Sequence, residues 1–275
     1  MPTNHVLVPV SLDERDRLVL EYACGLHVQG VNRVLVATAV ESAGVEAPVI
    51  AAEVDRVRER LTAMAAPLRE CPMHVEVRVV TGDTADAIEA LAHQVGIDVI
   101  CLGTEGKSSV DYLFAGSVSE DVVSTGTHRV MTVRYPLLEA AESPASLAED
   151  FARRLVVATD FSASSTRAWL SVFDRPKTAL GEATLLHVAA EGEDRGRAQV
   201  RLHGMLQIAE EHDVPARIEI REGEPAPAIL SFLEEVGATG VITGRRGMSR
   251  LRRAVLGSVS MQVLREAPCP IVIQP

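Results

Sequence analysis

Two stretches of the sequence carry the same small residues at the same spacing, Gly-x2-Gly-x9-Gly-Ser. They consist of Gly103, Gly106, Gly116 and Ser117 in the first copy and Gly244, Gly247, Gly257 and Ser258 in the second. Glycines let a backbone approach a ligand closely and adopt positive φ, and their amide groups can converge on an anion. A Gly-Ser pair that opens a helix adds the amide groups and dipole of the helix N-terminus. The spacing therefore indicates a phosphate-binding loop.

The same residues are also compatible with an ordinary helix start. Ser117 is followed three residues later by Glu120, which is the pattern of a capping box, and serine is a good N-cap by itself. For either copy alone the two interpretations are equally supported, and the two copies together favour a nucleotide site. A P-loop is excluded, because Cys101 stands where that motif needs its first glycine.

Both motifs lie within a longer internal repeat. Residues 74–136 match residues 215–275 at an offset of 141, and the opening runs at 5–11 and 154–160 also correspond. The chain is therefore a duplication. We expect one domain at residues 1–138, a linker at 139–152 and a second domain at 153–275.

Each copy alternates short apolar runs with longer segments whose apolar spacing is typical of helices. The expected strands of the second copy are residues 155–159, 184–188, 216–220, 240–244 and 270–274, and its expected helices are 163–174, 194–212, 225–236 and 258–266. Continuous apolar strands that alternate with helices indicate a parallel sheet covered on both faces. We predict an α/β fold of two tandem doubly wound, Rossmann-like domains, each with a five-stranded parallel sheet. The glycine motif follows the fourth strand, at the edge where such sheets bind ligands.

With these features the chain resembles the universal stress protein family. The resemblance is carried by the glycine motif after a fourth strand, an opening strand that ends in Asp, and a final strand that follows a Pro-Cys-Pro turn. It implies binding of ATP, with or without Mg²⁺, in which the glycine loop holds phosphates and ribose and the ends of the first two strands hold adenine. In the second domain it implicates Thr159, Asp160, Val188, Gly244, Gly247, Gly257, Ser258 and Val259.

The first domain departs from this pattern. Ser11 stands where the second domain has Asp160, so the carboxylate on the adenine side is missing. The first loop contains Glu105, which would oppose a triphosphate, whereas the second contains Arg245, Arg246, Arg250, Arg252 and Arg253. Guanidinium groups make charge-assisted contacts with phosphate. We therefore expect the second domain to bind ATP and the first site to be weakened or vacant. A solvated basic face, or a contact with the acidic linker, is the competing interpretation of the arginines.

Composition argues against several classes of protein. The 275 residues include 27 Lys and Arg against 38 Asp and Glu, a net charge of −11, whereas a nucleic-acid surface needs clustered basic residues. No apolar run approaches the roughly 20 residues that span a bilayer, and no secretory signal is apparent. We expect no nucleic-acid partner, no membrane association and a cytoplasmic location.

The cysteines and histidines show no pattern of metal ligands. The four cysteines are scattered without a CxxC pair, and none of the eight histidines lies in a recognised ligand spacing. We predict reduced, mostly buried thiols and no metal site.

Together with the glycine motif, the family resemblance implies an ATP-binding sensor or regulatory module of a stress response, with an adenine nucleotide and an unidentified regulatory protein as partners. The sequence contains no positioned base and no G-x-S-x-G elbow, so we expect slow hydrolysis at most. One alternative is a nucleotide-free interaction scaffold, and a weaker one is a slow ATPase or phosphotransferase. The family resemblance also implies that the two domains pair through their final strands as an internal pseudo-dimer, and a homodimer is a further expectation.

Overall fold

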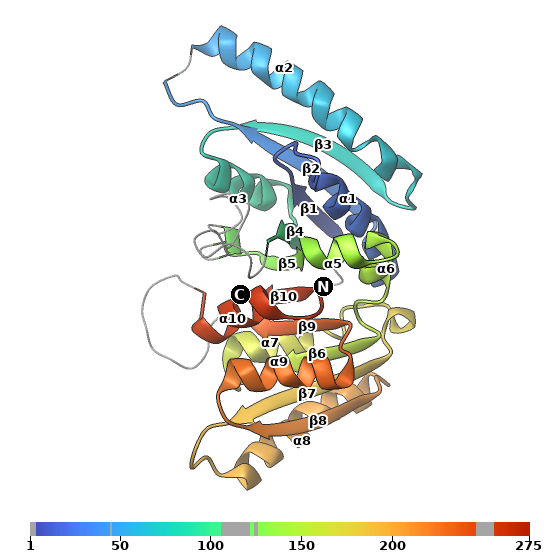
Figure 1. Ribbon diagram of the computed structural model, residues 1–275, viewed down its shortest axis with the longest axis vertical. Helices are drawn as coiled ribbons and strands as arrows, with labels where there is room; N and C mark the ends of the chain where they lie inside the picture. Colours follow the sequence, from blue (N-terminus) through green and yellow to red (C-terminus); the bar gives the residue numbers. More distant parts are fainter. Residues whose placement is uncertain (1–3, 45, 106–121, 124–125, 246–255) are drawn as a thin grey trace. The chain divides into compact units, whose positions relative to one another are not determined.

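The computed structural model divides the chain into two compact units, residues 3–148 and residues 149–275 (Figure 1). Within them the structure describes residues 4–44, 46–105, 122–123, 126–245 and 256–275. Four predicted site residues, Gly106, Gly116, Ser117 and Gly247, therefore lie outside the described residues. The two units repeat the same alternation of strands and α-helices through their first four strands, as the duplication predicts.

The first unit contains a parallel sheet in the order β3-β2-β1-β4-β5. Its strands are β1 (His5–Pro9), β2 (Arg33–Val40), β3 (His74–Thr81), β4 (Val99–Thr104) and β5 (Arg129–Arg134). Its helices are α1 (Asp16–Gly25), α2 (Ala47–Met64), α3 (Thr84–Val95), α5 (Tyr135–Ala140) and α6 (Pro144–Glu149), with 3-10 turns η1 (Leu26–Gln29) and η2 (Ala66–Glu70). The central strands β1 and β4 are almost wholly buried, which explains their continuous apolar sequences.

The second unit contains a parallel sheet in the equivalent order, β8-β7-β6-β9-β10. Its strands are β6 (Arg154–Ala158), β7 (Glu182–Ala189), β8 (Ala216–Glu222), β9 (Gly240–Gly244) and β10 (Ile271–Gln274). Its helices are α7 (Ala163–Leu170), α8 (Arg195–Glu211), α9 (Pro225–Val236) and α10 (Ser258–Glu266), with a 3-10 turn η4 (Lys177–Ala179). The predicted doubly wound α/β fold is confirmed.

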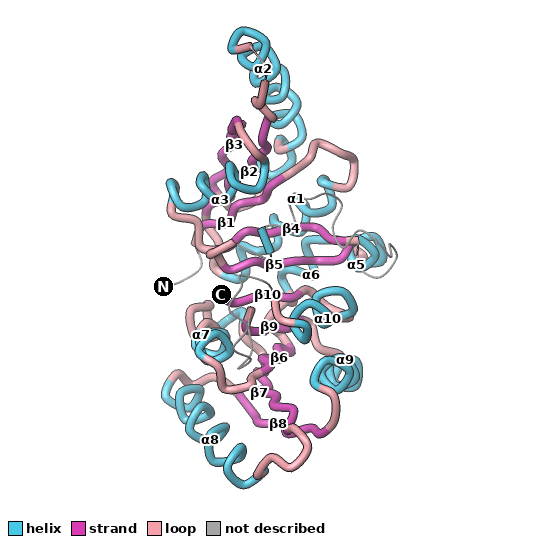
Figure 2. The backbone as a smooth tube through the Cα atoms, turned by 90° about the vertical axis from the view of Figure 1, so that its left-hand side faces the viewer, coloured by secondary structure: helices cyan, strands magenta, loops and turns pink. Residues whose placement is uncertain are grey.

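Helices cover both faces of each sheet. In the second unit, α7 and α8 lie on one face and α9 and α10 on the other (Figure 2). In the first unit, α1 and α2 lie on the face opposite α3. This layering buries apolar side chains on both sides of every central strand and brings the carboxyl ends of β6 and β9 to one edge.

Local sequence signals fix where several helices begin and end. Ser162 caps α7 by accepting a hydrogen bond from Ser165 N. Gly96 and Gly237 end α3 and α9 in the left-handed conformation, at φ of 67° and 57°, which glycine adopts without steric cost. The helices that approach the sheet edge therefore have defined termini.

The region expected to be a linker is largely helical. It contains the end of α5 and all of α6. Tyr135 and Leu138 of α5 and Ala148 of α6 are buried. The segment that joins the two repeats thus packs for most of its length as part of the first unit, which extends to residue 148.

The expectation that all four cysteines are reduced is wrong. Cys24, in the last turn of α1, and Cys71, just after η2, form a disulfide with a Cα–Cα distance of 5.7 Å. Cys101 and Cys269 are free and buried. The paired cysteines are 47 positions apart in the sequence, and only the packing of η2 beside α1 brings them together, so their spacing gave no signal.

In the described part of the chain, no helix combines the length and apolar character that crossing a bilayer requires.

Candidate ligand-binding site

A cavity of about 330 Å³ lies at the carboxyl edge of the second sheet. Four separate segments line it: the end of β6 with the start of α7, the end of β7, the start of α9, and the end of β9 together with the start of α10. Its size falls within the usual range for small-molecule sites. In a doubly wound sheet this edge is the usual place for a ligand.

Seven of the predicted site residues line this one cavity. They are Thr159, Asp160, Val188, Gly244, Gly257, Ser258 and Val259. The eighth, Gly247, lies outside the described residues. The structure therefore brings together residues that are up to a hundred positions apart in the sequence.

The loop between β6 and α7 fixes the Asp160 carboxylate. Its Oδ1 accepts hydrogen bonds from Ser162 N at 3.0 Å and from Ser165 Oγ at 2.9 Å. Phe161, which lies between Asp160 and Ser162, has a φ of 64°, a left-handed conformation that is unusual for a bulky residue. This turn places Asp160 at the cavity with a defined orientation.

Position 244 requires glycine because neighbouring residues pack too closely for a side chain, and not because its backbone is left-handed. A Cβ atom at this position would lie 2.5 Å from Ser164 Oγ and 2.8 Å from Ser165 N, so glycine lets β9 approach the first turn of α7. Gly244 and Gly103 are not among the glycines with positive φ, and Gly257 has a φ of −64°. Of the two properties that glycine offers, Gly244 therefore uses close approach and not the left-handed backbone.

The start of α10 forms the opposite wall of the cavity. Gly257 is the N-cap and has no side-chain cap, while Ser258 is the first helical residue. The serine therefore does not serve as the cap that an ordinary helix start would use. Ser260 Oγ donates a 2.6 Å hydrogen bond to Gly244 O, and Gly257 N donates one to Arg245 O, so the helix start is tied to the end of β9.

The arginines of the second loop are described only at Arg245. It is 4% exposed, which does not fit the interpretation of a solvated basic face for this residue. Its amide donates to Gln274 O at 2.6 Å, which continues the pairing of β9 with β10 beyond the strand. Arg246, Arg250, Arg252 and Arg253 lie outside the described residues.

One polar atom in the cavity lacks a hydrogen-bond partner within the described part of the chain. Thr243 lines the cavity and is 3% exposed, and its Oγ1 is buried without a partner. A buried hydroxyl without a partner costs free energy, on the order of 1–3 kcal/mol. A polar ligand that reached this hydroxyl would give it a partner.

A second hollow of about 540 Å³ adjoins the cavity and shares Asp160 and Val188 with it. His187 lies here, buried, with Nδ1 2.8 Å from Thr159 O and Nε2 3.1 Å from Glu193 Oε1. The guanidinium of Arg201 lies 3.9 Å from the centre of the Phe161 ring. Both ring nitrogens of His187 have hydrogen-bond partners, as is typical of a structural histidine near the end of a strand.

The matching loop of the first unit has the carboxylate in a different place. Equivalent strand pairs align the two units: Val6 pairs with Val99 in the first, and Leu155 pairs with Gly240 in the second. In this alignment Ser11 corresponds to Asp160, and Asp16 corresponds to Ser165. Asp16 Oδ2 accepts hydrogen bonds from the amides of Ser11 at 2.9 Å and Asp13 at 3.0 Å. Burial, with the nearby Asp13 carboxylate adding to it, raises the pKa of Asp16 from 3.8 to about 6.

Side chains of the first unit also fill the space beside its strand ends. A Cβ atom on Gly103 would lie 2.6 Å from the Tyr135 ring. The guanidinium of Arg15 lies 5.3 Å from the centre of that ring and forms an ion pair with Glu105. Burial raises the pKa of the Tyr135 hydroxyl, so this group stays protonated. Arg15 thus pairs with Glu105, the residue that was predicted to oppose phosphate.

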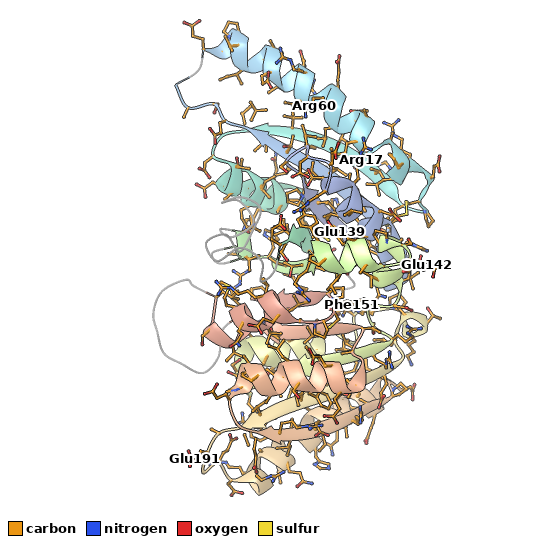
Figure 3. The ribbon with its side chains drawn as sticks, in the orientation of Figure 1. Arg17, Arg60, Glu139, Glu142, Phe151 and Glu191 are labelled. Carbon is orange, nitrogen blue, oxygen red and sulfur yellow. A yellow bond between two sulfur atoms is a disulfide. The ribbon has the colours of Figure 1, made fainter. Side chains whose placement is uncertain are left out.

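A larger cavity of about 930 Å³ lies elsewhere in the first unit, between α1, the end of α2 and η2. Its lining includes Arg17 and Arg60, labelled in Figure 3, together with both cysteines of the disulfide. None of the predicted site residues lines it.

Sequence reasoning missed about half of the residues that line the cavity of the second unit. They are Ala158, Ser165, Leu186, Pro225, Ile229, Thr243 and Ser260. Most follow from position, because residues that end β6, β7 and β9 or begin α9 must reach the same edge. Thr243, a polar residue in an otherwise apolar strand run, was the available signal.

Comparison with known proteins gives a consistent result. A model of the "universal stress protein family" matches residues 2–134 and again residues 152–275. A universal stress protein of Bacillus subtilis, YxiE, is 29% identical over 143 residues, which cover 44% of this chain and 97% of the relative. The crystal structure of a universal stress protein from Archaeoglobus fulgidus has the same fold, with a TM-score of 0.78 at 23% identity over 100% of this chain and 99% of its own. A solved universal stress protein in complex with cAMP covers 49% of this chain and 99% of its own, with a TM-score of 0.35 and 23% identity.

Proposed function

The chain belongs to the universal stress protein family, and on this premise we propose that its second domain binds ATP in the cavity at the carboxyl edge of β6, β7 and β9. The observation that carries the proposal is the convergence of seven predicted residues from separate segments on one cavity. Bound ATP would make the protein a nucleotide-responsive regulatory module of a stress response.

The lining supports a division of roles along the cavity. Asp160 and Val188 lie at the ends of the first two strands, where the family resemblance places adenine. Gly257, Ser258 and Val259 form the N-terminal turn of α10, where the helix dipole and amide groups favour phosphate. Thr243 Oγ1 would gain the hydrogen-bond partner that the described residues do not supply.

The lining also supports slow hydrolysis at most. Among the described residues that line the cavity there is no lysine, histidine or cysteine, and Asp160 is the one carboxylate. Its Oδ1 already accepts two hydrogen bonds from its own loop. A carboxylate held in this way can position a ligand, whereas a general base has to be free to take a proton.

Thr243→Val tests the proposal without creating a cavity. Valine has nearly the same shape and removes the hydroxyl, so the unliganded protein should keep or gain stability. We expect ATP affinity, measured by isothermal titration calorimetry, to fall about fivefold to tenfold, which corresponds to about 1 kcal/mol for one neutral hydrogen bond. Gly257→Val should lower it further, because a side chain would enter the cavity at an allowed φ.

The matched control is Gly116→Val, since Gly116 holds the equivalent motif position in the first domain. It should leave ATP affinity unchanged. Unchanged affinity in both Thr243→Val and Gly257→Val would contradict the assignment. Absence of any ATP binding by the wild-type chain would instead favour a nucleotide-free interaction scaffold.

A further inference from the structure

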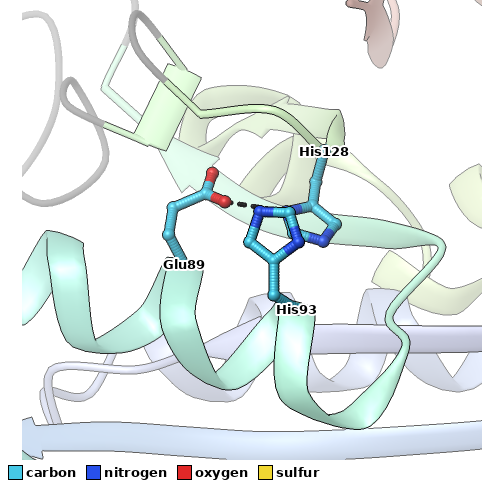
Figure 4. A group of neighbouring side chains, drawn as sticks. All are labelled: Glu89, His93 and His128. Atoms are coloured by element: carbon cyan, nitrogen blue, oxygen red, sulfur yellow. Dashed lines mark hydrogen bonds and ion pairs between the residues drawn. The ribbon is translucent and has the colours of Figure 1, made fainter.

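Three metal-ligating side chains meet in the first domain, away from the strand ends described above. Glu89 and His93 lie one turn apart on α3, and His128 lies just before β5 (Figure 4). One ligand atom from each residue lies within 4.8 Å of the other two. The helical spacing of four residues puts Glu89 and His93 on the same face of α3, toward the chain segment that carries His128.

One oxygen of the Glu89 carboxylate lacks a hydrogen-bond donor among the described residues. Its Oε2 lies 2.7 Å from His128 Nδ1. Its Oε1 is buried and, within the described part of the chain, has no hydrogen-bond donor. A buried carboxylate oxygen without a donor is unfavourable, and a bound cation would satisfy it.

Neighbouring residues hold the cluster in place. The hydroxyl of Thr127 lies 2.8 Å from His93 Nε2, and the two imidazole rings lie 4.4 Å apart. Gly126 packs so closely on Glu89 that a Cβ atom there would overlap Oε1. Contacts that orient ligating side chains in this way are typical of metal sites.

We propose that Glu89, His93 and His128 bind a divalent transition-metal ion of the zinc type. Two imidazole nitrogens and one carboxylate oxygen are a usual set for zinc, with a water molecule in the fourth position. Calcium and magnesium favour oxygen ligands, and the cluster contains no thiolate that would select a softer ion. The side chains of His128 and Glu89 are only 10% and 18% exposed, whereas His93 is exposed, so the ion would lie at the surface with one side open to water.

The second domain lacks this cluster. At the offset of 141 the equivalent positions are occupied by Leu230, Glu234 and Cys269. The ion would therefore tie α3 to the segment before β5 in the first domain alone. This segment follows the first glycine motif in the sequence, so metal binding would stabilise the domain whose nucleotide site is predicted to be weak.

The test is titration of Zn²⁺ into the untagged, metal-stripped full chain in competition with a chromogenic chelator, without nucleotide. We expect one ion per chain in the wild type. Glu89→Gln, His93→Gln and His128→Gln should each weaken binding more than about tenfold, since changes even outside the first coordination shell cost about that much. His203→Gln, which alters an exposed histidine on α8, is the matched control and should bind like the wild type.

A second readout uses Co²⁺, whose visible absorption reports the coordination of the bound ion. The wild type should give an intense band typical of four-coordinate Co²⁺, and Glu89→Gln should lose it. Gly126→Ala provides a variant that keeps all three ligands and should weaken Zn²⁺ binding by displacing the carboxylate. The proposal would be overturned if these substitutions left Zn²⁺ binding unchanged. It would also be overturned if the wild type bound Zn²⁺ no more tightly than Glu89→Gln does.

Discussion

The two domains follow the same path from first strand to first helix but place a carboxylate at opposite ends of it. In the second domain Asp160 ends the strand and binds Ser165 on the helix. In the first domain the residue types are exchanged, and Asp16 on the helix binds Ser11 at the strand end. Leu12 and Phe161 occupy the same position in the turn, with φ of 67° and 64°.

This exchange changes which side chains a ligand would meet at the strand ends of each domain. Asp160 lines the cavity of its domain. Asp16 is buried and binds the amides of its own loop. Beside it, Tyr135, Arg15 and Glu105 interact with one another across the strand ends. The two domains thus share the backbone conformation of this turn but place different side chains at it.

The largest effect is expected from the disulfide, which only the first domain contains among the described residues. Replacing Cys24 and Cys71 together by alanine should lower the free energy of unfolding of this domain by about 4 kcal/mol, because the unfolded chain regains the freedom of a 47-residue loop. Urea unfolding followed by circular dichroism measures this loss. The single tryptophan, Trp169, reports on the second domain and should unfold at the same urea concentration as in the wild type. An unchanged circular dichroism transition would contradict the expectation.

The pH dependence of stability should also distinguish the domains. Because the pKa of Asp16 is raised to about 6 in the folded state, its contribution is fully present below about pH 4 and is lost as pH rises through 6. Asp16→Asn should remove this dependence and be more stable than the wild type at pH 8 by up to about 3 kcal/mol. Thermal unfolding from pH 4 to pH 8 measures the difference. Parallel curves for the two proteins would show that Asp16 is not the titrating group.

Asp160→Asn should weaken ATP binding about tenfold, or about 1.4 kcal/mol. Asparagine keeps the shape and an acceptor oxygen but loses the charge that strengthens hydrogen bonds from a ligand. Titration calorimetry compares this variant with Ser11→Ala, the matched change in the first domain, which should bind ATP like the wild type. If both variants lose affinity equally, the two crevices are not as different as the structure indicates.

The smallest effect is expected from the ion pair between Arg15 and Glu105. Arg15 is half exposed and Glu105 a quarter exposed, so Glu105→Gln should change the free energy of unfolding by less than about 1 kcal/mol. The same variant should not create a second ATP site, because Asp16 and Tyr135 remain in place. If the variant instead bound ATP stoichiometrically in the first domain, the predicted weakness of that site would be due to Glu105 alone.

Much of the fold could be predicted because each strand and helix has its own local signal. Apolar runs such as residues 240–244 define buried strands, and Ser162 and Gly237 mark helix termini. The duplication adds a second copy of every signal. The candidate site had two sources: the repeated glycine motif indicated Gly257, and the family resemblance implicated Asp160.

The remaining features depend on contacts between distant segments. His128 lies 35 residues beyond His93, and although Glu89 and His93 have helical spacing, nothing local shows that His128 meets them. The pairing of Cys24 with Cys71 has the same origin. The expected pairing of the two domains through their final strands stays a prediction.

The most direct test of the central claim is the number of ATP molecules bound per chain. Titration calorimetry of the full chain with ATP, after removal of any copurified nucleotide, measures it. The structure predicts one site per chain, abolished by Gly257→Val and retained in Gly116→Val. Two sites of similar affinity, or one site that survives Gly257→Val, would contradict the assignment of ATP to the second domain.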